Sequence, residues 1–197
     1  MIRLEEEKDY KEVENLTREA FWNVYCPGCV EHYLIHKLRK DDCFIKELDF
    51  VLEKDHRIIG HIAYAKSYIK QGDYQKEVIL FGPVSILPVY QHRGYGHQLI
   101  EYSMNKARKM GYSAIVITGN PEYYQRFGFV RASKYNLYYE GMEEDFPYFM
   151  IKVFDETQVF SGIYNDPACY HVSSEDVDKF DQQFPSKMKE KHEGQLF

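Results

Sequence analysis

The stretch that decides the fold is Val84-Ser85-Ile86-Leu87-Pro88-Val89-Tyr90-Gln91-His92-Arg93-Gly94-Tyr95-Gly96. An apolar run ends in a proline, a polar loop follows, and two glycines open a segment whose apolar residues recur at helical spacing. The pattern predicts a strand, a loop and a helix. The first turn of a helix carries unpaired N–H groups and partial positive charge, and glycines let an anion come close to them. We therefore expect a diphosphate to bind the amides of residues 92–97, with Arg93 as an added positive charge.

The glycine pattern by itself is also typical of a simple tight turn. It lacks the third glycine of the dinucleotide fingerprint, because Leu99 stands there, and it lacks the Gly-Lys-Ser/Thr end of a nucleotide-triphosphate loop. Other parts of the chain must therefore support anion binding.

Composition indicates one domain with a sizeable core. The chain has 197 residues, of which 44% are hydrophobic and 16% aromatic, and its net charge of −6 argues against a nucleic-acid partner. The acidic start lacks an apolar stretch, and the longest uncharged run, residues 78–92, is shorter than the ~20 residues of a membrane helix. We expect a cytoplasmic monomer or homodimer without a membrane partner, with its four cysteines as thiols.

The order of the expected elements defines the fold class. A meander of strands comes first and strand–helix–strand units follow, which is typical of an α+β (α/β-like) domain with a mixed sheet flanked by helices. Pro83 cannot donate to a strand ladder, so we expect the sheet to bulge or splay near residues 82–83. Strands are expected at 2–4, 48–68 (a hairpin), 77–87, 113–118 and 148–154. Helices are expected from a cap at Asp9 through Phe21, and at 30–40, 96–110 and 122–127.

The pattern weakens after Phe154. Ser173 is a suitable cap for a helix that carries Val177 and Phe180, and the charged end beyond Pro185 is expected to fray. We therefore divide the chain into a main domain, residues 1–154, and a C-terminal extension, residues 155–197, packed on the same domain.

Two motifs in order carry a family resemblance. The strand into Gln91-x-x-Gly94-x-Gly96 is followed by a second strand and by Asn120-Pro121-Glu122-Tyr123-Tyr124-Gln125-Arg126-Phe127-Gly128-Phe129. These blocks resemble the GNAT family of N-acetyltransferases over Met1 to Phe154, and the tail is similar to the extension of one bacterial branch. The resemblance implies the centrally splayed sheet of the acyl-CoA N-acyltransferase fold. It also implies acetyl-CoA as cosubstrate, no metal, and direct acetyl transfer to a primary amine of a small molecule or peptide in a ternary complex.

The resemblance also implies roles for single residues. The backbone N–H of Val84 would face the thioester carbonyl, and Tyr124 would protonate the departing thiolate. The resemblance also places Asn120 beside the cofactor arm. Tyr124 and Asn120 both have a purely structural interpretation as well, since the chain holds 18 tyrosines and an asparagine before a proline commonly forms a turn. The expected cofactor contacts are Val84, Ser85, Ile86, Gln91, His92, Arg93, Gly94, Tyr95, Gly96, His97, Asn120 and Tyr124.

The general base is not assigned by the sequence. Some family members carry a glutamate where this chain has Leu80. Glu77 is the nearest carboxylate on the strand and is a weak candidate, while His61 on the hairpin, a water chain or an already neutral amine are alternatives. The missing glutamate also leaves open a CoA-binding sensor without catalytic activity.

A second motif lies outside these blocks. Cys26 and Cys29, followed by His32 and His36, have spacing compatible with zinc ligands or with a redox pair, although a turn and a helix with surface histidines explain them as well. In the family the first two helices border the acceptor site. We therefore expect acceptor contacts from Trp22, Tyr25, Cys29, Glu31 and His32.

Overall fold

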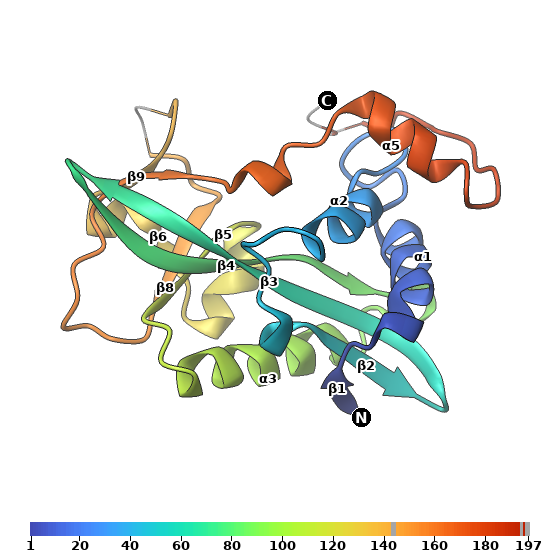
Figure 1. The fold of residues 1–197 in the computed structure, drawn as a ribbon, viewed down its shortest axis with the longest axis horizontal. Helices are drawn as coiled ribbons and strands as arrows, with labels where there is room; N and C mark the ends of the chain where they lie inside the picture. Colours follow the sequence, from blue (N-terminus) through green and yellow to red (C-terminus); the bar gives the residue numbers. More distant parts are fainter. Residues whose placement is uncertain (143–144, 194, 196–197) are drawn as a thin grey trace.

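The computed structural model describes residues 1–142, 145–193 and 195 of the chain. Within these residues the strands form one mixed sheet in the order β1-β2-β3-β4-β5-β8-β6, and β9 pairs with both β3 and β7 (Figure 1). The expected mixed sheet is confirmed. The strands are β1 (Ile2–Leu4), β2 (Phe50–Lys54), β3 (Arg57–Gln71), β4 (Tyr74–Ile86), β5 (Ala114–Thr118), β6 (Val130–Arg131), β7 (Leu137–Tyr139), β8 (Phe149–Val153) and β9 (Gly162–Asn165).

Helices cover both faces of the sheet. The Ser85 hydroxyl on β4 donates to Thr17 of α1, whereas Tyr64 on β3 hydrogen-bonds Ser103 of α3. Figure 1 shows α1 and α2 on one side and α3 on the other. The helices are α1 (Tyr10–Phe21), α2 (Glu31–Leu38), α3 (Tyr95–Lys109), α4 (Pro121–Tyr124) and α5 (Ser174–Asp181), with 3-10 turns η1 (Glu7–Asp9), η2 (Lys46–Leu48), η3 (Pro88–Tyr90), η4 (Gln125–Phe127), η5 (Ala132–Tyr135) and η6 (Ala168–Tyr170).

The sheet opens in the middle, as expected from Pro83. The register of β3 and β4 shifts by one residue where Ile62 and Tyr64 face Val84 and Phe81, so Gly82 and Pro83 form a bulge. On its other edge β4 pairs in parallel with β5 only at Ile79 and Leu80. Beyond Leu80 the two strands diverge, and the sheet is splayed next to the bulge.

The C-terminal extension adds to the sheet and to the first two helices. The two short strands β7 and β9 were not expected from the sequence, and β9 pairs with residues 68–70 of β3 beyond the part that β2 covers. Ser173 caps α5 through a bond from the Asp176 N–H, as expected. Further on, Trp22 Nε1 donates to the Met188 carbonyl at 2.9 Å, which holds this part of the tail along α1. The end expected to fray falls partly on residues 194, 196 and 197, which lie outside the described residues.

The core lies between the sheet and its helices. Val13 and Leu16 of α1 and Leu99 and Ile100 of α3 are almost completely buried against it. The helices of the described residues are all too short or too polar to cross a membrane.

Candidate functional site

A cleft of 670 Å³ occupies the splayed end of the sheet. Its walls come from the end of β4, the loop into α3, the end of β5 and α4. Most of the residues expected to contact a cofactor meet here, although they come from separate parts of the chain. Its lining consists of Tyr25, Val84, Ile86, Tyr90, Gln91, His92, Gly94, Gly96, His97, Ile100, Thr118, Gly119, Asn120, Tyr123, Tyr124 and Arg126.

The backbone of β4 turns polar groups into this cleft. The Leu87 N–H donates to the Ile59 carbonyl on β3 at 2.9 Å. Because the backbone groups of successive strand residues point in opposite directions, Ile86 and Val84 turn theirs away from β3, toward the gap with β5. The Ile86 carbonyl accepts a bond from Gln91 Nε2 at 3.0 Å. Gln91 thus ties the loop to the strand.

The start of α3 presents its first turn to the same cleft. Gly94 is the N-cap with a φ of 83°, a left-handed conformation that favours glycine. Gly96 follows inside the first turn, where an added Cβ would lie 3.3 Å from Tyr123 Oη. These amides form an open cradle with the positive end of a 15-residue helix behind it.

Three expected cofactor residues place their side chains elsewhere. Ser85 is completely buried and donates to Thr17 on the opposite face. Tyr95 Oη accepts from Lys54 Nζ at 2.7 Å, and the Arg93 guanidinium lies 6.0 Å from the centre of the Tyr90 ring. Ser85 and Tyr95 therefore have only their backbone available to the cleft, whereas the exposed Arg93 side chain makes no hydrogen bond or ion pair within the described residues.

A second cavity, of 340 Å³, adjoins the cleft. Tyr25, Val84, Thr118 and Tyr124 line both hollows, so the two meet at the bulge and the end of β5. The remaining lining residues of this second cavity are Phe21, Glu31, Leu34, Leu80, Phe81, Gly82, Pro83, Ile117, Tyr164, Asp166 and Tyr170.

Tyr124 stands at the junction in an aromatic cage. Its ring lies 6.0 Å from Phe81 and 5.9 Å from Phe129, centre to centre, and burial raises its pKa well above the usual value. A Cβ on Gly119 would come within 2.7 Å of the Tyr124 ring, so the glycine makes room for it. The ring is therefore held in place by its neighbours, and the phenol stays protonated. Asn120, at the same strand end, caps α4 by accepting the Glu122 N–H at 2.9 Å.

Carboxyl groups line the second cavity. Glu31 lies at the start of α2, where its Oε2 accepts the Val30 N–H at 3.0 Å, and burial raises its pKa. Asp166, after β9, accepts hydrogen bonds from Tyr164 at 3.0 Å and from Tyr139 at 2.5 Å. The cavity therefore combines two acidic groups with aromatic walls, an environment suited to a cationic group.

Glu77 lies outside both hollows. It is exposed at the start of β4, beside Tyr112 in a separate surface hollow. Seven strand residues separate it from Val84, a distance of roughly 20 Å. His61 is completely buried, with its Nε2 2.8 Å from Asp49 Oδ1. The structure therefore places Glu77, the candidate base of the sequence, away from the cleft, because the strand carries it to another hollow.

The cysteine and histidine motif does not converge on one point. Cys29 Sγ lies 3.3 Å from His32 Nδ1, but His36 turns to Glu14 at 2.9 Å. Burial raises the pKa of both Cys26 and Cys29, which is the opposite of what a reactive thiol needs. Neither a redox pair nor a zinc site built on all four residues fits this arrangement.

Two of the five expected acceptor contacts reach the second cavity, namely Tyr25 and Glu31. The other three do not line it: Trp22 and His32 contact the C-terminal extension, and Cys29 packs on Arg18 and His32. His32 Nε2 lies 3.1 Å from Asp181 Oδ1 with Cys29 behind it, and Trp22 lies 4.2 Å from the Arg18 guanidinium carbon. The structure therefore places these three side chains away from the acceptor cavity, with His32 facing α5 and Trp22 facing the segment at Met188.

Sequence reasoning missed several lining residues. Asp166, Tyr164 and Tyr170 come from the C-terminal extension, and only the pairing of β9 with β3 brings them to the bulge. The Tyr170 hydroxyl donates to the Gly82 carbonyl at 3.0 Å. The sequence shows Asp166-Pro167 only as a turn, and no local pattern marks it as part of a cavity.

Comparisons with known proteins agree with this geometry. The family model described as acetyltransferase (GNAT) domain matches residues 46–131. The uncharacterized N-acetyltransferase YhbS of Escherichia coli K12 is 27% identical over 137 residues, 70% of this chain and 77% of YhbS. A GNAT family acetyltransferase from Brucella melitensis, solved in complex with acetyl-CoA, is similar with a TM-score of 0.71 and 28% identity, covering 87% of this chain and 97% of that one. The Escherichia coli YhbS structure in complex with CoA is similar with a TM-score of 0.75 and 22% identity, covering 86% of this chain and 91% of that one.

Proposed function

The chain belongs to the GNAT family of acetyltransferases, and on this premise we propose that it transfers acetyl from acetyl-CoA directly to a primary amine. The single observation that carries the proposal is the junction of two hollows at Val84 and Tyr124. One hollow has the backbone cradle for a long diphosphate-bearing thioester, and the other is an acidic cavity for the acceptor.

The residues of the cleft fit acetyl-CoA. The amides of residues 92–97 would hold the diphosphate, as helix N-termini do, and the outward-facing groups of Val84 and Ile86 would pair with the pantetheine arm. The Val84 N–H then lies where a thioester carbonyl would develop negative charge, and a donor of this kind is worth about 3 kcal/mol in other acyl transfers. Acetyl-CoA supplies the activated acetyl group, and no metal ligand set is part of the proposal.

Tyr124 takes the role of general acid. A departing thiolate needs a proton, and a caged phenol with a raised pKa keeps one ready at the junction. The neighbouring Tyr123 lines only the larger cleft, where its hydroxyl lies beside Gly96, whereas Tyr124 also lines the second cavity. Proton transfer from Tyr124 completes the step without a covalent enzyme intermediate.

The acceptor is proposed to be a compact primary amine, held as a cation before it reacts. Glu31 and Asp166 supply the complementary charge, and Tyr25 and Tyr170 supply aromatic surface for the alkyl part. An amine must be neutral to attack, and a carboxylate with a raised pKa is a better proton acceptor than an ordinary glutamate. Glu31 is therefore the proposed base in place of Glu77.

The test measures free thiol released from acetyl-CoA across a set of small mono- and diamines. Glu31→Gln is expected to lower kcat/KM for the best amine by at least about tenfold, and Asp166→Asn to raise its KM, because each removes one negative charge. Glu175→Gln, on the exposed side of α5, is the matched control and should change neither value.

Binding and turnover separate this proposal from its rival. Titration calorimetry with acetyl-CoA measures binding independently of any amine. Tight binding without thiol release from any amine would favour a CoA sensor, and no binding at all would contradict both.

A further inference from the structure

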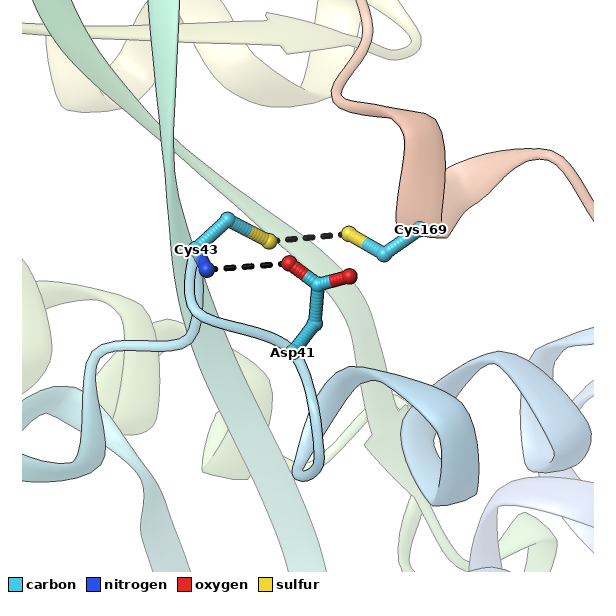
Figure 2. Close-up of side chains that lie close together, drawn as sticks. All are labelled: Asp41, Cys43 and Cys169. Atoms are coloured by element: carbon cyan, nitrogen blue, oxygen red, sulfur yellow. Dashed lines mark hydrogen bonds between the residues drawn. The ribbon is translucent and has the colours of Figure 1, made fainter.

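Two cysteines from distant parts of the chain meet outside the proposed active site. Cys43 lies in the loop after α2 and Cys169 lies in η6, and their sulfur atoms are 2.9 Å apart (Figure 2). The Cys43 carbonyl accepts the Lys66 N–H at 2.7 Å, which fixes its loop to β3. The contact therefore joins the sheet to the C-terminal extension.

The pair has one accessible and one buried member. Cys43 is partly exposed and lines a surface hollow of 440 Å³, whereas Cys169 is only 2% exposed. A thiolate on Cys169 accepts a hydrogen bond from Cys43, which lowers the pKa of Cys169 and raises that of Cys43. The Cys169 thiolate is thus stabilised by its neighbour, and the hollow that Cys43 lines opens beside the sulfur pair.

We propose that Cys43 and Cys169 are a redox modification site, converted to a disulfide by a hydroperoxide. The Cys169 thiolate attacks the peroxide, the O–O bond breaks, and the leaving oxygen takes a proton to become water or an alcohol. The resulting sulfenic acid at Cys169 is attacked by the Cys43 sulfur, which loses its proton, and the S–OH bond breaks to release water. The two thiols lose two electrons in total and the peroxide gains them.

The same cysteines could instead bind a metal, since Asp41 also lies nearby. One ligand atom from each of Asp41, Cys43 and Cys169 falls within 4.8 Å of the others. Two thiolates at 2.3 Å on a tetrahedral zinc, however, would be about 3.8 Å apart, well beyond the 2.9 Å seen here. The Asp41 carboxylate is exposed and accepts the Cys43 N–H at 3.0 Å (Figure 2). The geometry favours a disulfide over a metal site.

The disulfide would fix one wall of the acceptor cavity. Cys169 is next to Tyr170, whose hydroxyl holds the Gly82 carbonyl at the bulge, and three residues after Asp166. A covalent bond to the loop on β3 limits how far this segment can move away from the sheet. Oxidation therefore acts on the acceptor side and leaves the cleft for acetyl-CoA unchanged.

The decisive experiment maps thiols in the full chain before and after treatment with hydrogen peroxide. Of the four cysteines that are free in the structure, two should become resistant to alkylation, with the crosslinked peptide joining Cys43 and Cys169, and dithiothreitol should restore both. The disulfide should raise Tm by about 5 to 10 °C, because it closes a long loop in the unfolded chain. Cys26→Ser should behave as the wild type, and Cys43→Ser should show neither the crosslink nor the rise in Tm.

The wild-type peptide map needs no variant, so it stands even if Cys43→Ser folds poorly. A crosslink between Cys26 and Cys29, or no crosslink at all, would overturn the proposal. The proposal would also be overturned if the purified wild-type protein contained one zinc ion per chain and the Cys43→Ser variant contained none.

A second measurement rests on the proposed function. In wild-type protein oxidation should change the acceptor KM by at least about threefold, and it should leave the Kd of CoA unaltered, with no such change in Cys43→Ser. If the disulfide formed and the acceptor KM stayed the same, the proposed effect of the disulfide on the acceptor cavity would be overturned. Absence of any turnover would count against the proposed function and leave the thiol mapping unaffected.

Discussion

The end of β4 and the start of α2 both carry a motif just before a helix, but the structure uses them differently. At β4 the bulge and the divergence from β5 turn backbone groups of Val84 and Ile86 toward a cleft. At α2 the motif is covered instead, with His32 completely buried and its Nε2 3.1 Å from Asp181 Oδ1 of α5. The difference teaches that backbone groups released where a sheet splays indicate a binding site, whereas side chains buried against a neighbouring helix indicate packing.

The largest expected effect is on Tyr124. Tyr124→Phe removes the proposed proton donor and should lower kcat by about 100-fold or more, with the Kd of acetyl-CoA within about twofold of the wild type. Steady-state kinetics and calorimetry measure the two quantities. Tyr123→Phe is the matched control. An equal loss of kcat in Tyr123→Phe would contradict the proposal that Tyr124, at the junction of the two hollows, is the proton donor.

The second prediction tests the packing role of the other region. Asp181 Oδ1 lies 2.5 Å from Arg18 Nε, and Arg18 is only 1% exposed. Asp181→Asn leaves a buried guanidinium without its counter-charge and should lower the free energy of unfolding by about 3 kcal/mol. Denaturant titration measures this loss, and kcat should change little.

The comparison for Asp181 lies on the same helix. Glu175 forms an exposed pair with Lys179 at 2.7 Å, so Glu175→Gln should cost less than about 0.5 kcal/mol. If Asp181→Asn lowered the free energy of unfolding as little as Glu175→Gln, the packing role of the start of α2 would be contradicted. The same would follow if Asp181→Asn abolished turnover without any loss of stability.

A smaller effect is expected from the glycine beneath Tyr124. Gly119→Ala adds a Cβ that overlaps the ring and displaces the phenol, so kcat should fall by about tenfold with acetyl-CoA binding retained. Gly96→Ala narrows the amide cradle instead and should raise the Kd of acetyl-CoA with kcat largely kept. If Gly119→Ala weakened acetyl-CoA binding and Gly96→Ala lowered kcat, the roles given to the two hollows would be contradicted.

The smallest effect concerns pH. Burial lowers the pKa of His32 to about 4 from its ordinary value of 6.5, so between these values the unfolded chain binds more protons than the native one. The free energy of unfolding should therefore fall as pH drops from 6.5 toward 4. Buried His61, whose pKa is also lowered to about 4, contributes in the same direction.

His32→Gln should remove the part of this dependence that His32 contributes and flatten the curve between pH 6.5 and 4. His171→Gln, at an exposed position, should leave the curve as it is. Urea titrations at a series of pH values provide the measurement, and an unaltered slope in His32→Gln would contradict the packing role of this histidine.

Much of the fold was predictable from local patterns. The helix after Gly94, the strand with Pro83 and the short helix after Pro121 follow from spacing, glycine and proline chemistry. The two motif blocks also placed the cleft, because residues at the end of one strand and the start of the next helix are close in space whatever the rest of the chain does.

Residues distant in sequence were not predictable in this way. Glu77 is on the right strand but at its far end, and Trp22, Cys29 and His32 lie next to lining residues in sequence but do not line the cavity, since His32 faces Asp181 of α5 and Trp22 faces Met188. The register of the sheet decides where a strand residue lies relative to the cleft, and the element packed on a helix decides which of its faces is buried. A local sequence pattern shows neither of these.

The sequence by itself determined the strand–loop–helix junction and the break in the sheet, because these depend on neighbouring residues and on backbone conformations that glycine and proline impose. Only the tertiary structure decided which carboxyl groups face the acceptor cavity and that Cys43 meets Cys169. These contacts depend on the pairing of β9 with β3 and the docking of the extension, and long-range packing of this kind is written in no single stretch of the chain.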